Sequence, residues 1–290
     1  MINNIKNNLI SKGYTFPIKI FDENHVNNFY KEYKKDLKNI KSETLKFEHK
    51  FKSHIIFPWI NNLIKNPHIL SIVKDILGEN ILCWNSIIFF KKAQSKSFVG
   101  WHEDKTYWQL KNNKVITVSI AITNSNKKNG CLKILKNRRK VNYQIKDIKN
   151  NMLARGQDAI IQDNEEFDHI ELKAGECSIF EQDVIHGSDP NQSNDDRMLV
   201  AIRYIAPDNF TFNNHKYATL VSGKDNFNYY KEEPIPLKNF DYKCLDFHKK
   251  IMGKQANIFA KYKLKKYKLS FLSEILTSNF FRGIYYKYFK

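Results

Sequence analysis

The fold class is decided by the stretch Ile81-Leu-Cys-Trp-Asn-Ser-Ile-Ile-Phe-Phe-Lys-Lys92, in which β-branched and aromatic residues of the kind that favour strands follow one another. Similar apolar runs, separated by polar turns that carry asparagine and glycine, occupy Val115 to Thr123, Leu132 to Leu135, Cys177 to Glu181 and Met198 to Ile205. Several short strands at this spacing predict a sandwich or barrel, most simply a jelly roll. We therefore expect a mainly β protein with α additions.

Helices are predicted before these strands. Apolar residues recur at helical spacing after Asp22, which is the expected cap. A second helix is predicted to begin with Asn66 as its cap and Pro67 at its first position, and to stop at Gly78. We expect one domain over residues 1–290, with a helical part over 1–80, a jelly-roll core over 81–206 that carries a lid-like insertion at about 137–168, and a C-terminal extension over 207–290.

The net charge of +18 raises the question of a polyanionic partner. Only six of the 48 basic residues are arginine, and lysine is abundant together with asparagine, isoleucine, phenylalanine and tyrosine. Nucleic-acid binders usually show arginine clusters or a recognisable module, and neither is present. The charge is therefore interpreted as a solvated lysine surface without a specific nucleic-acid partner, with salt-dependent binding to polyanions as a side effect.

The cysteines and the hydropathy pattern bear on the compartment. Cys83, Cys131, Cys177 and Cys244 are scattered without a CxxC pair, so they are predicted to be small buried hydrophobic residues in a reducing compartment. Polar residues interrupt the N-terminus, and no stretch approaches 18 uncharged apolar residues. The expected location is the cytoplasm.

The tail from Lys261 to Lys290 contains eight basic residues and one glutamate, with apolar residues at helical spacing. One interpretation is a C-terminal helix that packs on the core. The other is a basic amphipathic helix that lies on an anionic membrane or a partner protein. Both interpretations require the same pattern, so both stay open.

A candidate metal site is indicated by His102-Glu-Asp104. Residues two apart on an extended segment point to the same face, so His102 and Asp104 can share one metal. His186 follows a short apolar strand and precedes Gly187, as expected of a ligand from another strand. Two imidazoles and one carboxylate are the protein ligands of the non-heme Fe(II) facial triad.

Positive side chains near this triad indicate a carboxylate-bearing cosubstrate. Arg197 is predicted to hold the distal carboxylate of a 2-oxoacid, because the guanidinium fork matches carboxylate geometry. The alternative for Arg197 is a surface ion pair with the aspartates that precede it. Arg203 is predicted to face the same side of its strand and to be a further cosubstrate-binding residue. Lys91 supplies a second positive group unless its neighbour Lys92 faces the site instead.

At these residues the sequence resembles the phytanoyl-CoA dioxygenase family of Fe(II)/2-oxoglutarate oxygenases, and more narrowly its halogenase-like natural-product branch. The resemblance runs from about residue 10 to about 230 and is carried by Gly100-Trp-His-Glu-Asp-Lys-Thr-Tyr-Trp108, Ile116-Thr-Val-Ser-Ile-Ala121, Asn129-Gly-Cys-Leu132, Leu153-Ala-Arg-Gly-Gln157, Lys173-Ala-Gly-Glu176, His186-Gly-Ser-Asp-Pro-Asn191, Ala201-Ile-Arg-Tyr204 and Tyr217-Ala-Thr-Leu-Val221.

The resemblance implies a double-stranded β-helix of the jelly-roll or cupin-like kind. It assigns iron to His102, Asp104 and His186, and the C5 carboxylate of 2-oxoglutarate to Arg197. It places Trp108 where related enzymes have an aromatic side chain near the cosubstrate. The sequence departs from the family at Lys136-Asn-Arg-Arg-Lys140, where Pro-Gly-Ser-His is frequent, so the family gives no guide to the substrate at that loop.

The expected reaction follows from Asp104. Halogenases of this fold carry a small residue at that position, whereas this chain keeps the carboxylate, which favours hydroxylation. We expect Fe(II), 2-oxoglutarate and O2 to hydroxylate an unactivated C–H of a small metabolite or of a carrier-, lipid- or glycan-linked substrate, with release of succinate and CO2. The alternatives are a non-catalytic jelly-roll binding protein and an oxygenase that acts on a lipid or glycan at a membrane surface. Nucleic-acid demethylation is disfavoured because no base-stacking platform or arginine groove is evident.

Overall fold

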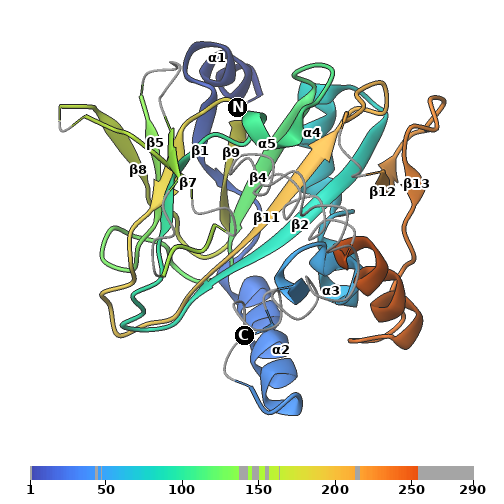
Figure 1. Ribbon diagram of the computed structural model, residues 1–290, viewed down its shortest axis with the longest axis horizontal. Coiled ribbons are helices and arrows are strands. Elements are labelled where there is room, and N and C mark those ends of the chain that lie inside the picture. Colours follow the sequence, from blue (N-terminus) through green and yellow to red (C-terminus); the bar gives the residue numbers. More distant parts are fainter. Residues whose placement is uncertain are drawn as a thin grey trace, which may run out of the picture.

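The computed structural model describes most of the chain and shows two facing β-sheets with helices on the outer side of the larger one (Figure 1). The described residues are 2–42, 45–46, 48–136, 143–145, 150–153, 157–162, 164–212 and 216–253. The predicted tail helix over 261–290 lies outside them, as does most of the loop at 136–140. The mainly β jelly-roll prediction is confirmed, whereas the division into parts stays a prediction.

The helices are α1 (Ile2–Lys12), α2 (Glu23–Asn39), α3 (Pro58–Leu63), α4 (Pro67–Leu77) and α5 (Lys105–Trp108), with 3-10 turns η1 (Glu48–Lys50) and η2 (Ser53–Ile55). Residues 242–253 are also helical. The strands are β1 (Tyr14–Lys19), β2 (Ile81–Lys91), β3 (Val99–His102), β4 (Val115–Ala121), β5 (Leu132–Leu135), β6 (Tyr143–Ile145), β7 (Gln157–Ala159), β8 (Phe167–Ile170), β9 (Glu176–Glu181), β10 (His186–Ser188), β11 (Arg197–Ile205), β12 (Tyr217–Ser222) and β13 (Lys231–Glu232).

The large sheet has the strand order β1-β9-β4-β11-β2-β12-β13, and the small sheet has the order β3-β10-β5-β8. Strands β6 and β7 form a separate pair. All neighbours pair antiparallel except β12 and β13, which are parallel. Because β3 and β10 belong to the small sheet and β11 to the large one, residues of the predicted site come from both walls of the jelly roll.

Strand β11 is buried on both faces, and its alternation decides which side chains reach the interior between the sheets. Met198, Val200, Ile202 and Tyr204 pack in the core formed with the helices. Leu199 belongs to a second apolar cluster, on the opposite face of the strand. Since successive side chains of a strand point to opposite faces, the odd-numbered arginines at 197 and 203 share the face of Leu199.

The helix boundaries agree with the sequence signals. Asp22 is the N-cap residue of α2, although its side chain makes no capping hydrogen bond. Asn66 caps α4, because its side-chain oxygen accepts hydrogen bonds from the backbone N–H of His68 and Ile69. Gly78 ends α4 with a φ of 96°, a region that favours glycine. These helices cover the outer face of the large sheet and keep its apolar side chains from water.

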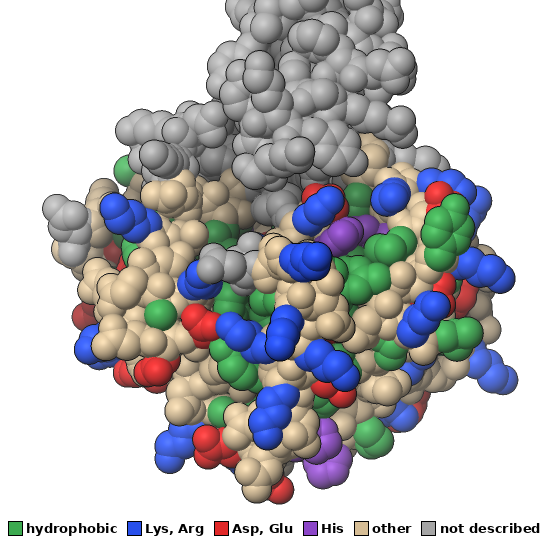
Figure 2. Space-filling view, turned by 90° about the horizontal axis from the view of Figure 1, so that it is seen from below, with side chains coloured by type: hydrophobic (Ala, Val, Ile, Leu, Met, Phe, Trp, Pro, Cys, Tyr) green, Lys and Arg blue, Asp and Glu red, His purple; other side chains and the backbone are tan. Residues whose placement is uncertain are grey.

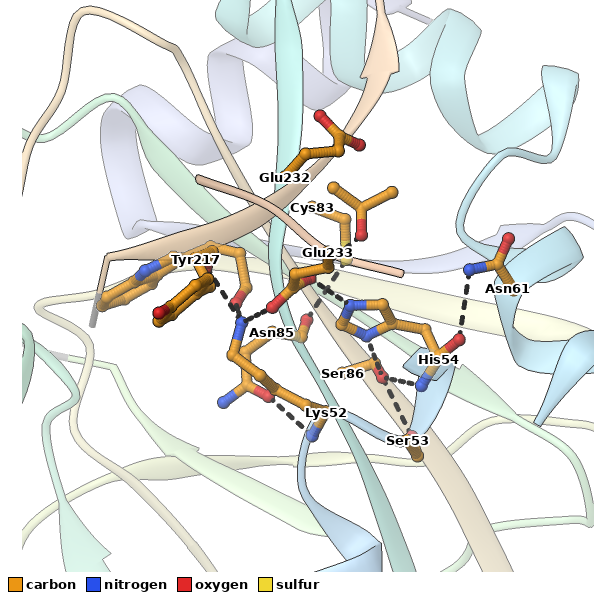
Figure 3. A network of polar contacts seen from close by, with 12 residues as sticks. Lys52, Ser53, His54, Asn61, Cys83, Asn85, Ser86, Tyr217, Glu232 and Glu233 are labelled. Atoms are coloured by element: carbon orange, nitrogen blue, oxygen red, sulfur yellow. Dashed lines mark hydrogen bonds and ion pairs between the residues drawn. The ribbon is translucent and has the colours of Figure 1, made fainter. Parts of the chain in front are cut away.

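A buried polar network joins the segment after β13 to η2 and β2 (Figure 3). Glu233 accepts hydrogen bonds from Lys52 and, at 2.9 Å, from the hydroxyl of Thr219. His54 Nε2 lies 2.8 Å from Glu233 Oε2, the oxygen that also accepts from Thr219. On the other side of the ring, His54 Nδ1 lies 2.8 Å from Ser86 Oγ. Each of these side chains is almost completely buried, so the network fixes the chain after β13 against the large sheet.

The described surface and the cysteines bear on the charge and compartment predictions. On the face shown in Figure 2, Lys and Arg side chains are spread among acidic and apolar ones and do not form one continuous stripe. The four cysteines are free and buried, as predicted. In the described residues, no helix has both the length and the apolar character needed to cross a bilayer.

We expect Glu233→Gln to lower the free energy of unfolding by about 3 kcal/mol, because breaking a buried ion pair leaves the Lys52 ammonium uncompensated. Lys52 and His54 lower the pKa of Glu233 from 4.5 to about 2, overcoming the opposing effect of burial. The folded pKa lies below the unfolded one, so this stabilisation is present above pH 4.5 and is lost as the pH falls toward 2. Urea unfolding between pH 2 and pH 7 gives the free energy of unfolding at each pH. Below pH 4.5 this free energy should fall less steeply in the variant than in the wild type.

The matched control is Glu232→Gln, since Glu232 is exposed and precedes Glu233 directly. Its effect on stability is expected to stay within about 0.5 kcal/mol. Equal losses in the two variants would show that the buried network does not stabilise the fold.

Candidate metal centre

Three of the predicted residues meet between the sheets. His102, Asp104 and His186 are all buried, and each offers a ligand atom within 4.8 Å of the others. The register of the small sheet brings the histidines together, because His186 on β10 lies directly opposite His102 at the end of β3. Their ring centroids are 4.2 Å apart. Among the described residues, this is the one group of three or more His, Cys, Asp or Glu side chains that could hold a metal ion.

Backbone hydrogen bonds fix which nitrogen of each imidazole can bind a metal. The Nδ1 of His102 lies 2.9 Å from the carbonyl of Gly100, and the Nδ1 of His186 lies 3.0 Å from the carbonyl of Val184. A carbonyl only accepts, so each Nδ1 carries the proton and each Nε2 carries the lone pair. This is the arrangement in which metal-binding histidines are usually oriented by a partner on the other ring nitrogen.

Asp104 reaches the site by a different route from the one predicted. β3 ends at His102, and Asp104 has helical φ and ψ of −77° and −30° as the N-cap residue of α5. The expectation of an extended segment through Asp104 is therefore wrong, although the two side chains do converge, with Oδ1 of Asp104 3.9 Å from Nε2 of His102. The turn is held because the N–H of Lys105 donates to the carbonyl of Gln182 at 2.8 Å.

The electrostatics of the site favour the deprotonated forms of all three side chains. Burial lowers the pKa of His102 to about 3, helped by the neighbouring His186, and burial also lowers the pKa of His186. Burial alone would raise the pKa of Asp104, but Arg203 and the two imidazoles outweigh it and lower that pKa. Metal ions bind neutral imidazole and carboxylate, so the residues present fit a divalent cation.

Arg197 and Lys91 form a buried cationic pair farther along the interior. They lie directly opposite each other in the antiparallel pairing of β11 with β2, and both are at most 1% exposed. Within the described part of the chain no group accepts a hydrogen bond from Arg197, whose Nε is buried without a partner. The alternative of a surface ion pair for Arg197 is wrong, since Asp196 instead accepts from Lys34 and Tyr30.

The structure also decides between the two lysines. Lys91 is buried and donates to Ser188 Oγ at 2.7 Å and to the carbonyls of Asp189 and Gly130, whereas Lys92 is partly exposed on the alternate position. The backbones at Gly130 and Asp189 lie close together because residue 130 is a glycine. It has a φ of 73°, and a Cβ there would lie 2.1 Å from the Asp189 carbonyl oxygen. Burial and the neighbouring Arg197 lower the pKa of Lys91 to about 6, so its ammonium form is disfavoured at neutral pH, and an anion bound beside it would raise that pKa again.

Ser188 connects the cationic pair with the metal ligands. It lies two residues beyond His186 on β10, so both side chains share one face of the strand, about 7 Å apart along it. The Lys91 ammonium that contacts Ser188 is therefore near the triad. The contact of Ser188 with Lys91 was not predicted from the sequence. The one signal for it was the place of Ser188 in the segment that follows His186.

Arg203 and Trp108 lie on the metal side of the interior. Arg203 Nη2 is 3.3 Å from Oδ1 of Asp104, and its guanidinium carbon is 4.6 Å from the centroid of the Trp108 ring. The sequence predicted that both residues contact the cosubstrate, and that role stays a prediction. What the structure adds is their contact with each other and with a predicted metal ligand.

Comparisons with known proteins place the chain in a family. The family model for phytanoyl-CoA dioxygenase (PhyH) matches residues 20–199. A probable alpha-ketoglutarate-dependent hypophosphite dioxygenase of Stutzerimonas stutzeri is 30% identical over 162 residues, which cover 53% of this chain and 56% of that protein. The chain thus spans little more than half the length of this curated relative.

Solved structures share the fold over more of the chain. The apo form of the non-heme monooxygenase ThoJ superposes with a TM-score of 0.76 at 23% identity, over 89% of this chain and 99% of that one. CytC3 with Fe(II) and alpha-ketoglutarate gives a TM-score of 0.61 at 20% identity, over 82% and 95% of the two chains. The chain belongs to the phytanoyl-CoA dioxygenase family of non-heme iron, 2-oxoglutarate-dependent oxygenases.

We expect Co(II), added to the metal-free protein as a probe of the site, to raise the melting temperature. At a metal concentration about 100 times Kd, binding to the folded state stabilises it by about 2.7 kcal/mol. His186→Ala should abolish the shift because it removes one of three ligands. The control is His68→Ala, at an exposed histidine of α4, which should keep the full shift. An unchanged shift in His186→Ala would show that the metal binds elsewhere.

Proposed function

We propose that this chain hydroxylates an unactivated C–H bond of a small metabolite, or of a carrier-, lipid- or glycan-linked substrate, in a reaction that consumes 2-oxoglutarate and O2. The balance is one hydroxyl group inserted into the substrate, with succinate and CO2 released from the cosubstrate. The proposal rests on family membership and on a buried His/Asp/His triad that accompanies two buried basic side chains, neither of which has a carboxylate partner in the described residues.

The cationic pair is the observation that carries the proposal. Like charges directly opposite in a sheet destabilise it, and a buried charge without a partner costs more still. Arg197 and Lys91 are such a pair, with no carboxylate beside Arg197 in the described residues. A bound carboxylate would compensate both charges, and the guanidinium fork can receive it in a bidentate manner. A dicarboxylic 2-oxoacid has one end for this pair and another for the metal.

The division of labour in this proposal is simple. When bound, the iron supplies the oxidising chemistry with O2 and the oxoacid. The chain holds the ion through His102, Asp104 and His186 and orients the cosubstrate through Arg197, with Lys91 as a second positive group. Apolar side chains of the interior, including Phe180 at 5.0 Å from the His186 ring, exclude water from the centre.

The retained Asp104 supports hydroxylation over halogenation, because a carboxylate occupies the position that halogenases leave to a small side chain. The hypophosphite dioxygenase is named for a small inorganic substrate, so small polar substrates belong in the first screen. We also propose a cytoplasmic location, in keeping with four buried free cysteines.

We expect the purified protein with Fe(II) to release succinate from 2-oxoglutarate, and Arg197→Met to weaken 2-oxoglutarate binding about 10- to 100-fold. A hydrogen bond to a charged group contributes about 1.5–3 kcal/mol, and each 1.4 kcal/mol is tenfold in affinity. Calorimetric titration with 2-oxoglutarate and succinate detection by mass spectrometry give the two readouts.

Stability separates a binding defect from misfolding. Because Arg197 is buried without a partner, Arg197→Met should leave the ligand-free protein at least as stable as the wild type. Lys92→Met is the matched control and should bind 2-oxoglutarate normally, since Lys92 is on the opposite face from Lys91. Unchanged 2-oxoglutarate binding in Arg197→Met would contradict the assignment of the distal carboxylate to this residue.

A further inference from the structure

The guanidinium of Arg203 lies between a carboxylate and an indole ring. Its Nη2 is 3.3 Å from Oδ1 and 3.4 Å from Oδ2 of Asp104, so one nitrogen bridges both oxygens. Its guanidinium carbon lies over the Trp108 ring, 4.6 Å from the ring centroid. The Arg203 side chain is 12% exposed and that of Asp104 is 5% exposed, so this ion pair is shielded from water.

The two partners of Arg203 are joined by a single helical turn. Asp104 is the N-cap residue of α5 and Trp108 is its last residue, and the N–H of Trp108 donates to the carbonyl of Asp104 at 3.2 Å. Trp108 is held in turn by the Thr211 hydroxyl, which donates to its carbonyl at 2.7 Å, and by an edge-to-face contact with Trp84. The carboxylate and the indole therefore keep a fixed spacing to the guanidinium.

Arg203 itself lies on β11, the central strand of the large sheet. It lies within β11, opposite Thr117 of β4 on one side and Asn85 of β2 on the other. Both neighbours belong to the large sheet, whereas His102 and His186 belong to the small sheet. The contact between Arg203 and Asp104 thus ties the turn after β3 to the opposite wall of the jelly roll.

Asp104 needs such a tie more than the histidines do. Each imidazole is oriented by a backbone carbonyl of its own strand. Asp104 lies beyond the end of β3, and among the described residues Arg203 is the one hydrogen-bond donor to its carboxylate. A short carboxylate at the start of a single helical turn would otherwise rotate freely about its side-chain bonds.

We propose that Arg203 is a positioning residue that holds the Asp104 carboxylate in its metal-binding orientation, and that Trp108 serves by stacking on the guanidinium. The inference rests on the proposed metal centre and deepens it. It gives Arg203 a different task from Arg197, which forms no ion pair with a carboxylate among the described residues. Outer contacts of this kind are typically worth 10–100-fold in metal affinity.

The test is calorimetric titration of the metal-free, full-length protein with Co(II) in the absence of 2-oxoglutarate. Arg203→Met should weaken Co(II) binding about 10- to 100-fold, because the ligand loses its orienting partner. Arg203→Lys keeps the charge but not the planar, stacked donor and should restore part of the affinity. The visible absorption spectrum of bound Co(II) reports the coordination geometry, and it should change in Arg203→Met.

Trp108→Leu provides a second variant that leaves both charged groups in place. It should weaken Co(II) binding less than Arg203→Met, while Trp108→Phe should stay near the wild type because it keeps an aromatic face. The matched control is Lys114→Met, which removes the exposed ion pair with Asp208 at 2.7 Å and should change nothing in the titration. Thermal unfolding of each metal-free variant verifies that it is folded.

The outcomes separate a failure of the positioning role from a failure of the proposed metal centre. Asp104→Ala must weaken Co(II) binding, and if it does not, the metal centre itself is wrong. If Asp104→Ala weakens binding while Arg203→Met binds Co(II) with wild-type affinity and spectrum, the positioning role is overturned and the centre stands. A loss of 2-oxoglutarate affinity in Arg203→Met with unchanged Co(II) binding would also overturn it, in favour of a direct cosubstrate contact.

Discussion

The site depends first on the register between β10 and β3, which places His186 directly opposite His102. Side chains alternate between the two faces of a strand, so a slip of β10 by one residue would turn the His186 imidazole to the other face of the small sheet, away from His102. The register is held from both sides, since β10 also pairs with β5 through His186 opposite Ile134. Two ligands that are far apart in the sequence thus acquire a fixed spacing from backbone hydrogen bonds, before any metal is bound.

The same chain treats its buried lysines in two different ways. Lys52 is neutralised by Glu233 and surrounded by carbonyl acceptors, including those of Trp84 and Tyr217. Lys91 also donates to backbone carbonyls, but it lies opposite Arg197, and in the described residues neither of the two forms an ion pair with a carboxylate. The buried Lys52 therefore has an opposite charge beside it, whereas Lys91 and Arg197 do not. A bound dianion would recover the free energy lost at Lys91 and Arg197, and this contrast supports the anion site proposed above.

Much of this architecture could be predicted because it is local. Strand alternation put Arg197 and Arg203 on one face, and the caps at Asn66 and Gly78 bounded α4 as predicted. The route of Asp104 was predicted wrongly, because the end of β3 depends on a tertiary hydrogen bond from Lys105 to Gln182. The network of His54 and Glu233 was missed altogether, since its partners are 179 residues apart and neither has a motif around it. Contacts between distant polar residues leave no periodic signal in a single sequence.

The separation of the two arginines along β11 gives the last constraint on how the interior works. Residues six apart on a strand have Cα atoms about 20 Å apart, which is too far for both backbones to border one small ligand. In the proposed site, Arg203 therefore lies at the metal end beside Asp104, and Arg197 lies at the far end beside Lys91. Ser188 connects the two ends, because it shares one face of β10 with His186 and accepts a hydrogen bond from Lys91. In the proposed site, a cosubstrate that contacts both ends would extend from the triad past Ser188, which suits an elongated dicarboxylate better than a compact anion such as phosphate.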